Sequence, residues 1–554
     1  MESSKSRQLR LLTGVDAYGR AFEPAGPVRA GKRVGMFFWL WIGQPYATGV
    51  YDAERILSSP GGSNTLFHKD TTESPNGQQH FWGQPLFGYY NSMDLWVICR
   101  QLELLTLAGV DFIVFDATNA ITYKNVYLRI LAEIERLQAN GWQPPKAAFY
   151  THSYSMRTTM ALYEELYRPR IHPDAWYRED GKPVVIAYTD QEDDKRWARR
   201  EMKDDGYDPS CYPAEVLDFF RFYKPQWPLD PSYPDGFPWV EWTFPQPLHT
   251  DVMSVSVASH PNVPFSFTLT RGSENWGRGW DAAQKKNCPD KVNTGAFFQS
   301  QWEHALNTDP ATVFVGGWNE WIAYKQMWDG EYMMCDAVSR EFSRDIEPMR
   351  GGYEDAFYLQ LITNIRRYKY GPFEERSPGE SMTYYAIHPE GLGRDAPGVC
   401  EALRYTQPVP PNHIHHITVG CTGGKLTFDA VFQHPVSDED MQSFQLLLGC
   451  GNAKKGGFES YSWHITPLPG QQALYLKRLD RSAEEMLQVD HNRCGNRLTV
   501  EVMRHRLGAS YDSIYFKAAV HVEDPGDIMS YYTSGSALPP GRLSYMYRLG
   551  QQQE

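Results

Sequence analysis

Short apolar runs alternate with segments of helical periodicity along the chain between residues 33 and 371. A run of about four to eight apolar residues is typical of a strand buried in a parallel sheet. Such runs begin near residues 34, 111, 145, 182, 239, 252, 264 and 312. Eight buried strands that alternate with helices predict an α/β fold, a (β/α)8 TIM-like barrel with insertions.

The segments between the first four runs have helical spacing. The clearest runs from Ser92, a candidate N-cap, to Gly109, a candidate C-cap. Further helices are expected at 126–137, 157–167, 195–203, 294–307 and 354–370, the last one closing the barrel unit. Between the fifth, sixth and seventh runs helical spacing is weak or missing, and residues 206–236 form an excursion rich in Pro, Asp and Tyr.

The residue composition and the pattern of expected elements change on either side of this region. Residues 1–32 form an irregular lead-in, and residues 372–380 (PFEERSPGE) have the composition of a linker. From residue 381 to 554, short strands are separated by turn-rich segments, which predicts an accessory all-β sandwich domain.

The net charge limits the classes of binding partner, and the cysteine spacing bears on metal sites and disulfides. The 554 residues carry a net charge of −13, so nucleic acid and anionic membranes are poor partners. The polar N-terminus lacks the apolar core of a signal peptide, and no apolar run is long enough to span a membrane. The eight cysteines show no metal-binding spacing and are interpreted mostly as buried thiols, one or two disulfides being the alternative. We expect a cytoplasmic protein, or a secreted or periplasmic one if a native leader was removed. The sequence does not indicate the oligomeric state.

Several residue types that are common in active sites follow the last predicted strand. Residues 312–315 (TVFV) are apolar, Gly316 and Gly317 end the strand, and Trp318, Asn319, Glu320 and Trp321 follow. Indoles can stack on the apolar faces of sugar rings, and Asn and Glu can hydrogen-bond hydroxyls. Apolar walls can also raise the pKa of a carboxyl group enough for acid/base catalysis. The alternative is that both tryptophans are core residues and Glu320 is a salt-bridged strand end.

Polar residues follow several other predicted strands, and in this barrel class chemistry lies at strand C-terminal ends. Cleavage of a glycosidic bond needs two carboxyl groups. Glu320 is the first candidate, as general base or nucleophile, and either Asp116 or Glu241 is the second. Asp116 could instead form a capping or structural hydrogen bond, and Glu241 could be a paired carboxylate of the barrel wall.

A second set of residues is predicted to bind substrate together with the Trp-Asn-Glu-Trp motif. For each, packing or capping is the alternative. The set is Asn119, His152, His80, Trp82, Tyr89 and Tyr90. Arg271 and Arg278 in the 271–292 loop are candidates for a lid that would suit an anionic substrate, the alternative being a solvated surface loop.

The chain resembles the glycoside hydrolase family 99-like superfamily over about residues 33–370. The resemblance rests on the first apolar run (VGMFFWLW), His80–Gly83, Pro85–Tyr90 with the following Ser-Met-Asp, the Ala-Gly-Val-Asp-Phe segment at 108–112, and Gly317–Trp321. It implies a barrel in which a Glu after Asn, here Glu320, acts as a base and a second Glu three residues on is the acid. That second position is Ala323 in this chain, so the family's mechanism and mannoside specificity do not carry over.

These observations predict a glycoside hydrolase acting on an oligo- or polysaccharide, with no metal and no cofactor. A glycan lyase or transferase is the alternative within enzymes, and a non-catalytic carbohydrate-binding protein is the alternative outside them. The sequence leaves open the sugar, its linkage, endo or exo action and the stereochemistry.

Overall fold

The computed structural model describes residues 3–373, 380–480, 486–508 and 511–549, which form two compact units that are each discontinuous in the sequence. One unit comprises residues 30–353 and 396–405, and the other residues 1–29, 354–395 and 406–554. The predicted linker at 372–380 lies largely outside the described residues. None of the helices among the described residues combines the length and apolar character that a membrane crossing requires.

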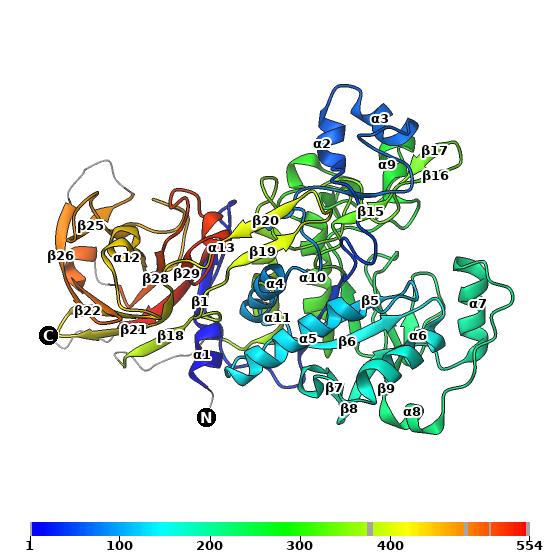
Figure 1. Cartoon of the computed structure of the whole chain (residues 1–554), viewed down its shortest axis with the longest axis horizontal. Coiled ribbons are helices and arrows are strands. Elements are labelled where there is room, and N and C mark those ends of the chain that lie inside the picture. Colours follow the sequence, from blue (N-terminus) through cyan, green and yellow to red (C-terminus); the bar gives the residue numbers. More distant parts are fainter. Residues whose placement is uncertain (1–2, 374–379, 481–485, 509–510, 550–554) are drawn as a thin grey trace. The chain divides into compact units, whose positions relative to one another are not determined.

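The first unit is a nearly closed parallel barrel (Figure 1). In chain order its strands are β3 (Arg33–Phe38), β5 (Phe112–Ala117), β6 (Lys146–Thr151), β8 (Lys182–Ile186), β9 (Arg221–Gln226), β10 (Gly236–Pro238), β11 (Val252–Val255) and β14 (Thr312–Val315). Each pairs with the next in that order except β10 and β11, which lie at the two edges of the sheet, and β14 returns to β3 with Val313 opposite Val34. Between β10 and β11 the Ser254 hydroxyl donates to the Trp239 carbonyl at 2.8 Å.

Helices cover the barrel, and most lie where the sequence predicts them; those at Ala214–Phe219 and Phe265–Arg271 are not predicted. The helices are α4 (Leu95–Ala108), α5 (Lys124–Ala139), α6 (Ser155–Leu162) with a π-helical turn at Tyr163–Tyr167, α7 (Gln191–Glu201), α8 (Ala214–Phe219), α9 (Phe265–Arg271) and α10 (Ala296–Thr308). Within the described residues, no helix separates β9 from β10 or β10 from β11. The weak helical spacing of the sequence between the fifth and sixth apolar runs agrees with this. The predicted cap of α4 is wrong by two residues, because Asp94 accepts from the first-turn amides while the Ser92 hydroxyl accepts from the Ile42 amide.

Two strand predictions are wrong. The strand predicted at 264–269 is instead helical: Pro264 is the N-cap of α9, which runs from Phe265 to Arg271. The missing strand is β9, in the excursion at 206–236, where charged and apolar residues alternate and hide the pattern. The strand predicted at 239–242 is β10, which ends at Pro238, so Trp239–Trp242 already belong to the barrel mouth.

The core of the barrel is aromatic. Phe37, Phe112, Tyr150, Tyr223 and Phe314 lie inside it, all less than a tenth exposed. Large rings from several strands fill the interior, and in this barrel class the polar chemistry lies at the strand ends.

An arm made of two short helices, α2 (Ala53–Ser58) and α3 (Gly62–His68), occupies the long β3–α4 connection. It is followed by β4 (Gln79–Phe81), which pairs with β15 (Ile322–Tyr324). The hairpin of β16 (Gln326–Trp328) and β17 (Glu331–Met333) comes next in the chain after β15. The ammonium of Lys325, which is fully buried, donates to the carbonyls of Lys69 and Ser74 at 2.8 and 2.7 Å and so ties the end of this arm to β15.

The second unit is a large antiparallel β-structure, which confirms the predicted C-terminal sandwich. Its main strands are β18 (Met382–Tyr385), β21 (Ile414–Thr422), β22 (Lys425–Phe432), β27 (Arg497–Met503), β26 (Met486–Cys494), β25 (Leu474–Arg478), β24 (Trp463–Pro467), β23 (Gln445–Cys450), β28 (Ser513–Val520) and β30 (Leu543–Arg548), given in sheet order. The sheet folds on itself, since Tyr384 of β18 and Phe428 of β22 both contact the Phe516 ring of β28.

This unit also contains the predicted lead-in and the helix that the sequence predicts to close the barrel. The lead-in forms α1 (Ser4–Arg10), β1 (Leu12–Val15) and β2 (Ala21–Phe22), and β1 pairs with β30. Helix α11 (Ala356–Lys369) is grouped with the same unit, where Arg366 donates to the carbonyl oxygens of Leu9 and Arg10. The lead-in is therefore structured rather than irregular.

Candidate active site

Glu320 lies at the C-terminal mouth of the barrel, a few residues after β14. It is 4% exposed, and its Oε2 accepts a hydrogen bond from Nη2 of Arg344 at 3.0 Å. The same nitrogen donates to Oδ1 of Asp336 at 3.0 Å. One guanidinium group therefore bridges two carboxylates, and we call Glu320, Asp336, Arg344 and His260 the Arg344 cluster.

The geometry around Arg344 fixes the state of His260. Nη1 of Arg344 lies 2.9 Å from Nδ1 of His260, and because a guanidinium only donates, Nδ1 must accept. The imidazole is therefore neutral with its proton on Nε2. Burial and the nearby Arg344 charge lower the pKa of His260 to about 4, which agrees with this state.

The pKa values of the two carboxyl groups in the cluster shift in opposite directions. Burial, with the charges of Asp336, Asp345 and Asp116, raises the pKa of Glu320 well above its usual range, although Arg344 opposes this. Burial also acts to raise the pKa of Asp336, but Arg344 and His260 outweigh it and leave that pKa below its ordinary value. Opposed shifts of this kind assign an acid and a base within one site.

Asp116 and Asp345 complete the ring of acidic groups. Asp116 ends β5, is 3% exposed, and accepts from the amide and hydroxyl of Thr118 at 3.0 and 2.7 Å. Burial raises its pKa. Oδ1 of Asp345 accepts from the Glu320 amide at 2.6 Å and orients the backbone of the motif, and burial raises the pKa of Asp345 to about 6.

Glu241, the other predicted catalytic partner, does not belong to this cluster. It is 6% exposed, and its Oε1 lies 2.7 Å from Nε2 of His249. The geometry is that of a paired carboxylate of the barrel wall, the alternative considered from sequence.

The tryptophans of the motif are buried. Trp318 and Trp321 have 0% exposure, as does Trp82, whose ring stacks on Trp321 at 4.3 Å and whose indole nitrogen donates to the Glu320 carbonyl at 3.0 Å. Asn319 bridges to β3 by accepting from the Trp39 amide and donating to its carbonyl. These residues position Glu320 and present no face to a sugar.

The remaining predicted binding residues are also placed by the structure. His80 is 1% exposed with Nε2 2.9 Å from the Ser74 hydroxyl, and burial lowers its pKa to about 4. Tyr89 donates to Asp52 at 2.7 Å and Tyr90 to Glu347 at 2.8 Å, both in buried surroundings. Asn119 is exposed on the loop after β5. Of this set, His152 reaches the mouth and is described further below.

The two arginines predicted as a lid do not form one. Arg278 is fully buried and donates to the Ser343 hydroxyl and the Asp345 carbonyl. Arg271 pairs with Glu331 and, at 3.4 Å, with Asp329. Neither is positioned to neutralise a substrate carboxylate at the Arg344 cluster.

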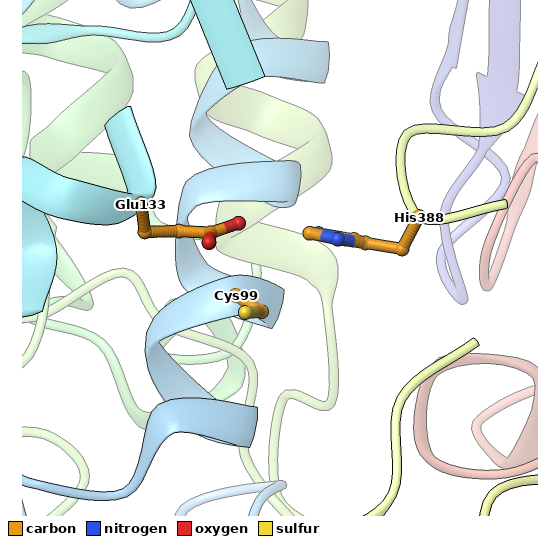
Figure 2. Close-up of side chains that lie close together, drawn as sticks. All are labelled: Cys99, Glu133 and His388. Carbon is orange, nitrogen blue, oxygen red and sulfur yellow. The ribbon is translucent and has the colours of Figure 1, made fainter. Parts of the chain in front are cut away.

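Two groups of side chains have metal-ligand chemistry but do not fit a metal. His260, Cys335 and Asp336 lie close together, yet the Nε2 of His260 carries a proton and Arg344 adds a positive charge. Cys99 on α4 and Glu133 on α5 approach each other (Figure 2), but burial raises the pKa of the Cys99 thiol and Arg136 already holds Glu133 in two bonds of 2.7 Å. His388, also drawn there, belongs to the other unit. All eight cysteines are free, and only Cys99 and Cys288 are buried, so the interpretation of most as buried thiols is wrong.

Sequence reasoning missed Asp336, Arg344 and His260. His260 comes shortly after β11 and could have been found by the same strand-end rule that identified Asp116. Asp336 and Arg344 lie in the irregular segment after β17, where no periodicity marks which side chains turn back to the mouth.

No protein-family model matches the chain, and no curated protein matches it. Among solved structures it is similar to a GH99 endo-alpha-mannosidase from Bacteroides thetaiotaomicron, with 14% identity over 61% of this chain and 97% of that chain and a TM-score of 0.36. The same organism's enzyme in complex with bis-tris-propane gives 13% identity and a TM-score of 0.35. Similarity at this level carries no argument about activity.

Proposed function

We propose that the chain is a glycoside hydrolase whose catalytic carboxyl groups are Glu320 and Asp336. The observation that carries the proposal is the shared Nη2 of Arg344, which holds both carboxylates at 3.0 Å at the mouth of the barrel. The opposed pKa directions give the roles: Glu320 is the proton donor and Asp336, whose side chain is 37% exposed, is the ionised nucleophile. This reverses the base or nucleophile role expected for Glu320 from sequence and supplies a carboxylate that Ala323 does not.

The geometry also supports a stereochemical outcome. Because both oxygens lie 3.0 Å from one nitrogen, they are at most about 6 Å apart. Retaining enzymes separate their carboxyl groups by about 5–5.5 Å, and inverting enzymes need about 6.5–9.5 Å to admit a water molecule. We therefore propose retention through a covalent glycosyl-Asp336 intermediate, with Asp116 adding the negative charge that keeps Glu320 protonated.

The test is hydrolysis of a panel of para-nitrophenyl glycosides and oligosaccharides by the wild type, Glu320→Gln, Asp336→Asn and Glu241→Gln. Product from the wild type, loss of at least about a thousandfold in the first two variants and little change in the third are expected. Proton NMR of the first-formed anomer then reports retention. Full activity in Asp336→Asn would refute the assignment of the nucleophile.

A non-catalytic carbohydrate-binding protein is the second candidate, and the burial of Glu320 to 4% favours it. It would bind oligosaccharides without forming product, and Glu320→Gln would leave the affinity unchanged. A lyase or transferase remains an untested alternative, and the two arginines predicted to serve a lyase are engaged elsewhere.

A further inference from the structure

Buried polar atoms without a hydrogen-bond partner gather at the ends of β6, β8 and β9. They are Nε2 of His152, the hydroxyl of Tyr188 and Oδ2 of Asp230. His152 is 2% exposed, Tyr188 is 0% exposed, and the Asp230 side chain is 11% exposed. Because an unpaired buried polar group lowers stability, such a concentration at a barrel mouth calls for a partner from outside the chain.

The three side chains follow neighbouring strands of the barrel. The rings of His152 and Tyr188 have centroids 5.7 Å apart. The Asp230 amide donates to the carbonyl of Trp227, the residue whose ring stacks on His152, at 3.1 Å. Burial raises the pKa of Tyr188, and the charges of Tyr150 and Asp230 add to the rise.

An aromatic wall connects this polar group to the Arg344 cluster. The half-buried Trp227 stacks on His152 at 4.1 Å, and its other neighbour is Trp239 at 4.8 Å. The Arg344 guanidinium lies over the Trp239 ring at 4.8 Å. The two sites are therefore contiguous along one side of the mouth.

The loop between β9 and β10, residues 227–235, covers the group and carries Asp230. Gln226 contacts the loop through both ends of its amide: Oε1 accepts from the Tyr233 amide at 3.0 Å, and Nε2 makes long contacts of 3.4–3.5 Å with loop carbonyls. The Thr250 hydroxyl donates to the Pro234 carbonyl at 2.9 Å. Leu229 in this loop is 78% exposed and has φ 70°, a left-handed conformation that is unfavourable for leucine. The long contacts and the strained residue make this loop suited to displacement by a ligand.

We propose that His152, Tyr188, Asp230 and Trp227 form a sugar-binding subsite for an uncharged pyranose unit next to the scissile bond. The inference rests on the proposed function and names its second subsite. The hydroxyls of the sugar would supply the missing partners, donating to Asp230 and bonding Tyr188 and His152, with one ring face on Trp227. Asp230, which lies 3.8 Å from its partner Arg196, disfavours a sugar that carries a carboxylate or sulfate. Binding requires residues 227–235 to move aside and close again.

Tyr188→Phe tests the subsite because it removes only the hydroxyl. Tyr127→Phe is the matched control, since the Tyr127 hydroxyl is also buried and unpartnered but lies on the outer helix α5. In the absence of sugar, neither variant should lower the melting temperature, because each removes an unsatisfied group. With para-nitrophenyl disaccharide glycosides, binding measured by calorimetry should weaken about tenfold in Tyr188→Phe and stay unchanged in Tyr127→Phe.

The outcomes separate the subsite from the catalytic proposal. A wild type that binds the disaccharide glycosides but releases no nitrophenol refutes the hydrolase, and Tyr188→Phe then still decides the subsite. Unchanged disaccharide binding in Tyr188→Phe, equal loss in both variants, or no disaccharide binding by the wild type overturns the subsite. Tighter binding of uronic acid or sulfated glycosides overturns the assignment to an uncharged sugar.

Discussion

Replacing Arg344 with methionine is the sharpest test of the electrostatics at the barrel mouth. Arg344 is 0% exposed and Glu320 is 5% exposed in side-chain terms, so the substitution leaves a buried carboxylate without its cation. Where Glu320 is ionised, above its raised pKa, removing the cation of this buried pair costs about 3–5 kcal/mol of unfolding free energy. The Asp336 contact adds little to this because that side chain is 37% exposed.

The penalty should depend on pH with a definite sign. Without Arg344, the pKa of Glu320 in the folded state rises further above its value in the unfolded chain. A group with a raised folded pKa stabilises the fold below its unfolded pKa, and that stabilisation is lost as the pH rises through the folded pKa. The destabilisation by Arg344→Met should therefore be smaller at pH 5 than at pH 8.

Urea denaturation followed by tryptophan fluorescence at both pH values measures this. The double variant Arg344→Met/Glu320→Gln has no buried charge left at this pair and should recover more than half of the loss. Arg271→Met is the control, because its guanidinium is 35% exposed and its loss should cost about 1 kcal/mol or less. Equal penalties at pH 5 and pH 8, together with additive effects in the double variant, would refute the reasoning.

Two further predictions concern buried groups near the motif. Burial raises the pKa of Glu347 to about 7, so Glu347→Gln should gain about 3 kcal/mol relative to the wild type between pH 4.5 and pH 8, measured by urea denaturation; a pH-independent difference would contradict this. Lys325→Met removes the donor to the carbonyls of Lys69 and Ser74 and should cost about 2–4 kcal/mol, with faster amide exchange in α3 but not in α5; uniform exchange in both helices would argue against a local tie.

The barrel could be predicted because its strands carry a local pattern. Thr312–Val315 and Lys182–Ile186 are buried from nearly end to end and are flanked by turn residues, so their apolar runs identify them. Arg221–Gln226 could not be found in this way, because its outward side chains are charged and its pattern is that of a surface segment. Pro264–Leu269 was assigned to a strand because a short apolar run has no periodicity that separates a strand from one turn of a buried helix.

The site was predicted less completely, because burial after a strand depends on the loops that fold over it. Asp116 lies near the end of β5 and Glu320 a few residues after β14, and both belong to the same ring of charges, so strand order places them. Asp336 and Arg344 reach the mouth through a long irregular segment, and no local rule fixes where such a segment returns. The same limit applies to Glu241, because its partner His249 is a loop residue that the sequence does not place beside it.

The motif tryptophans show why residue type alone misassigns a sugar site. Trp318 and Trp321 were expected to present their faces to substrate, but the loop after β3 and the stacked ring of Trp82 cover them completely. Among the tryptophans that follow barrel strands, Trp41 after β3, Trp227 after β9 and Trp242 after β10 remain partly accessible, and no helix follows these strands closely enough to bury them. A sugar that binds this barrel would therefore meet aromatic faces from the poorly patterned part of the sequence. Of the two carboxyl groups proposed to act on it, Glu320 comes from a well-patterned part and Asp336 from the irregular segment after β17.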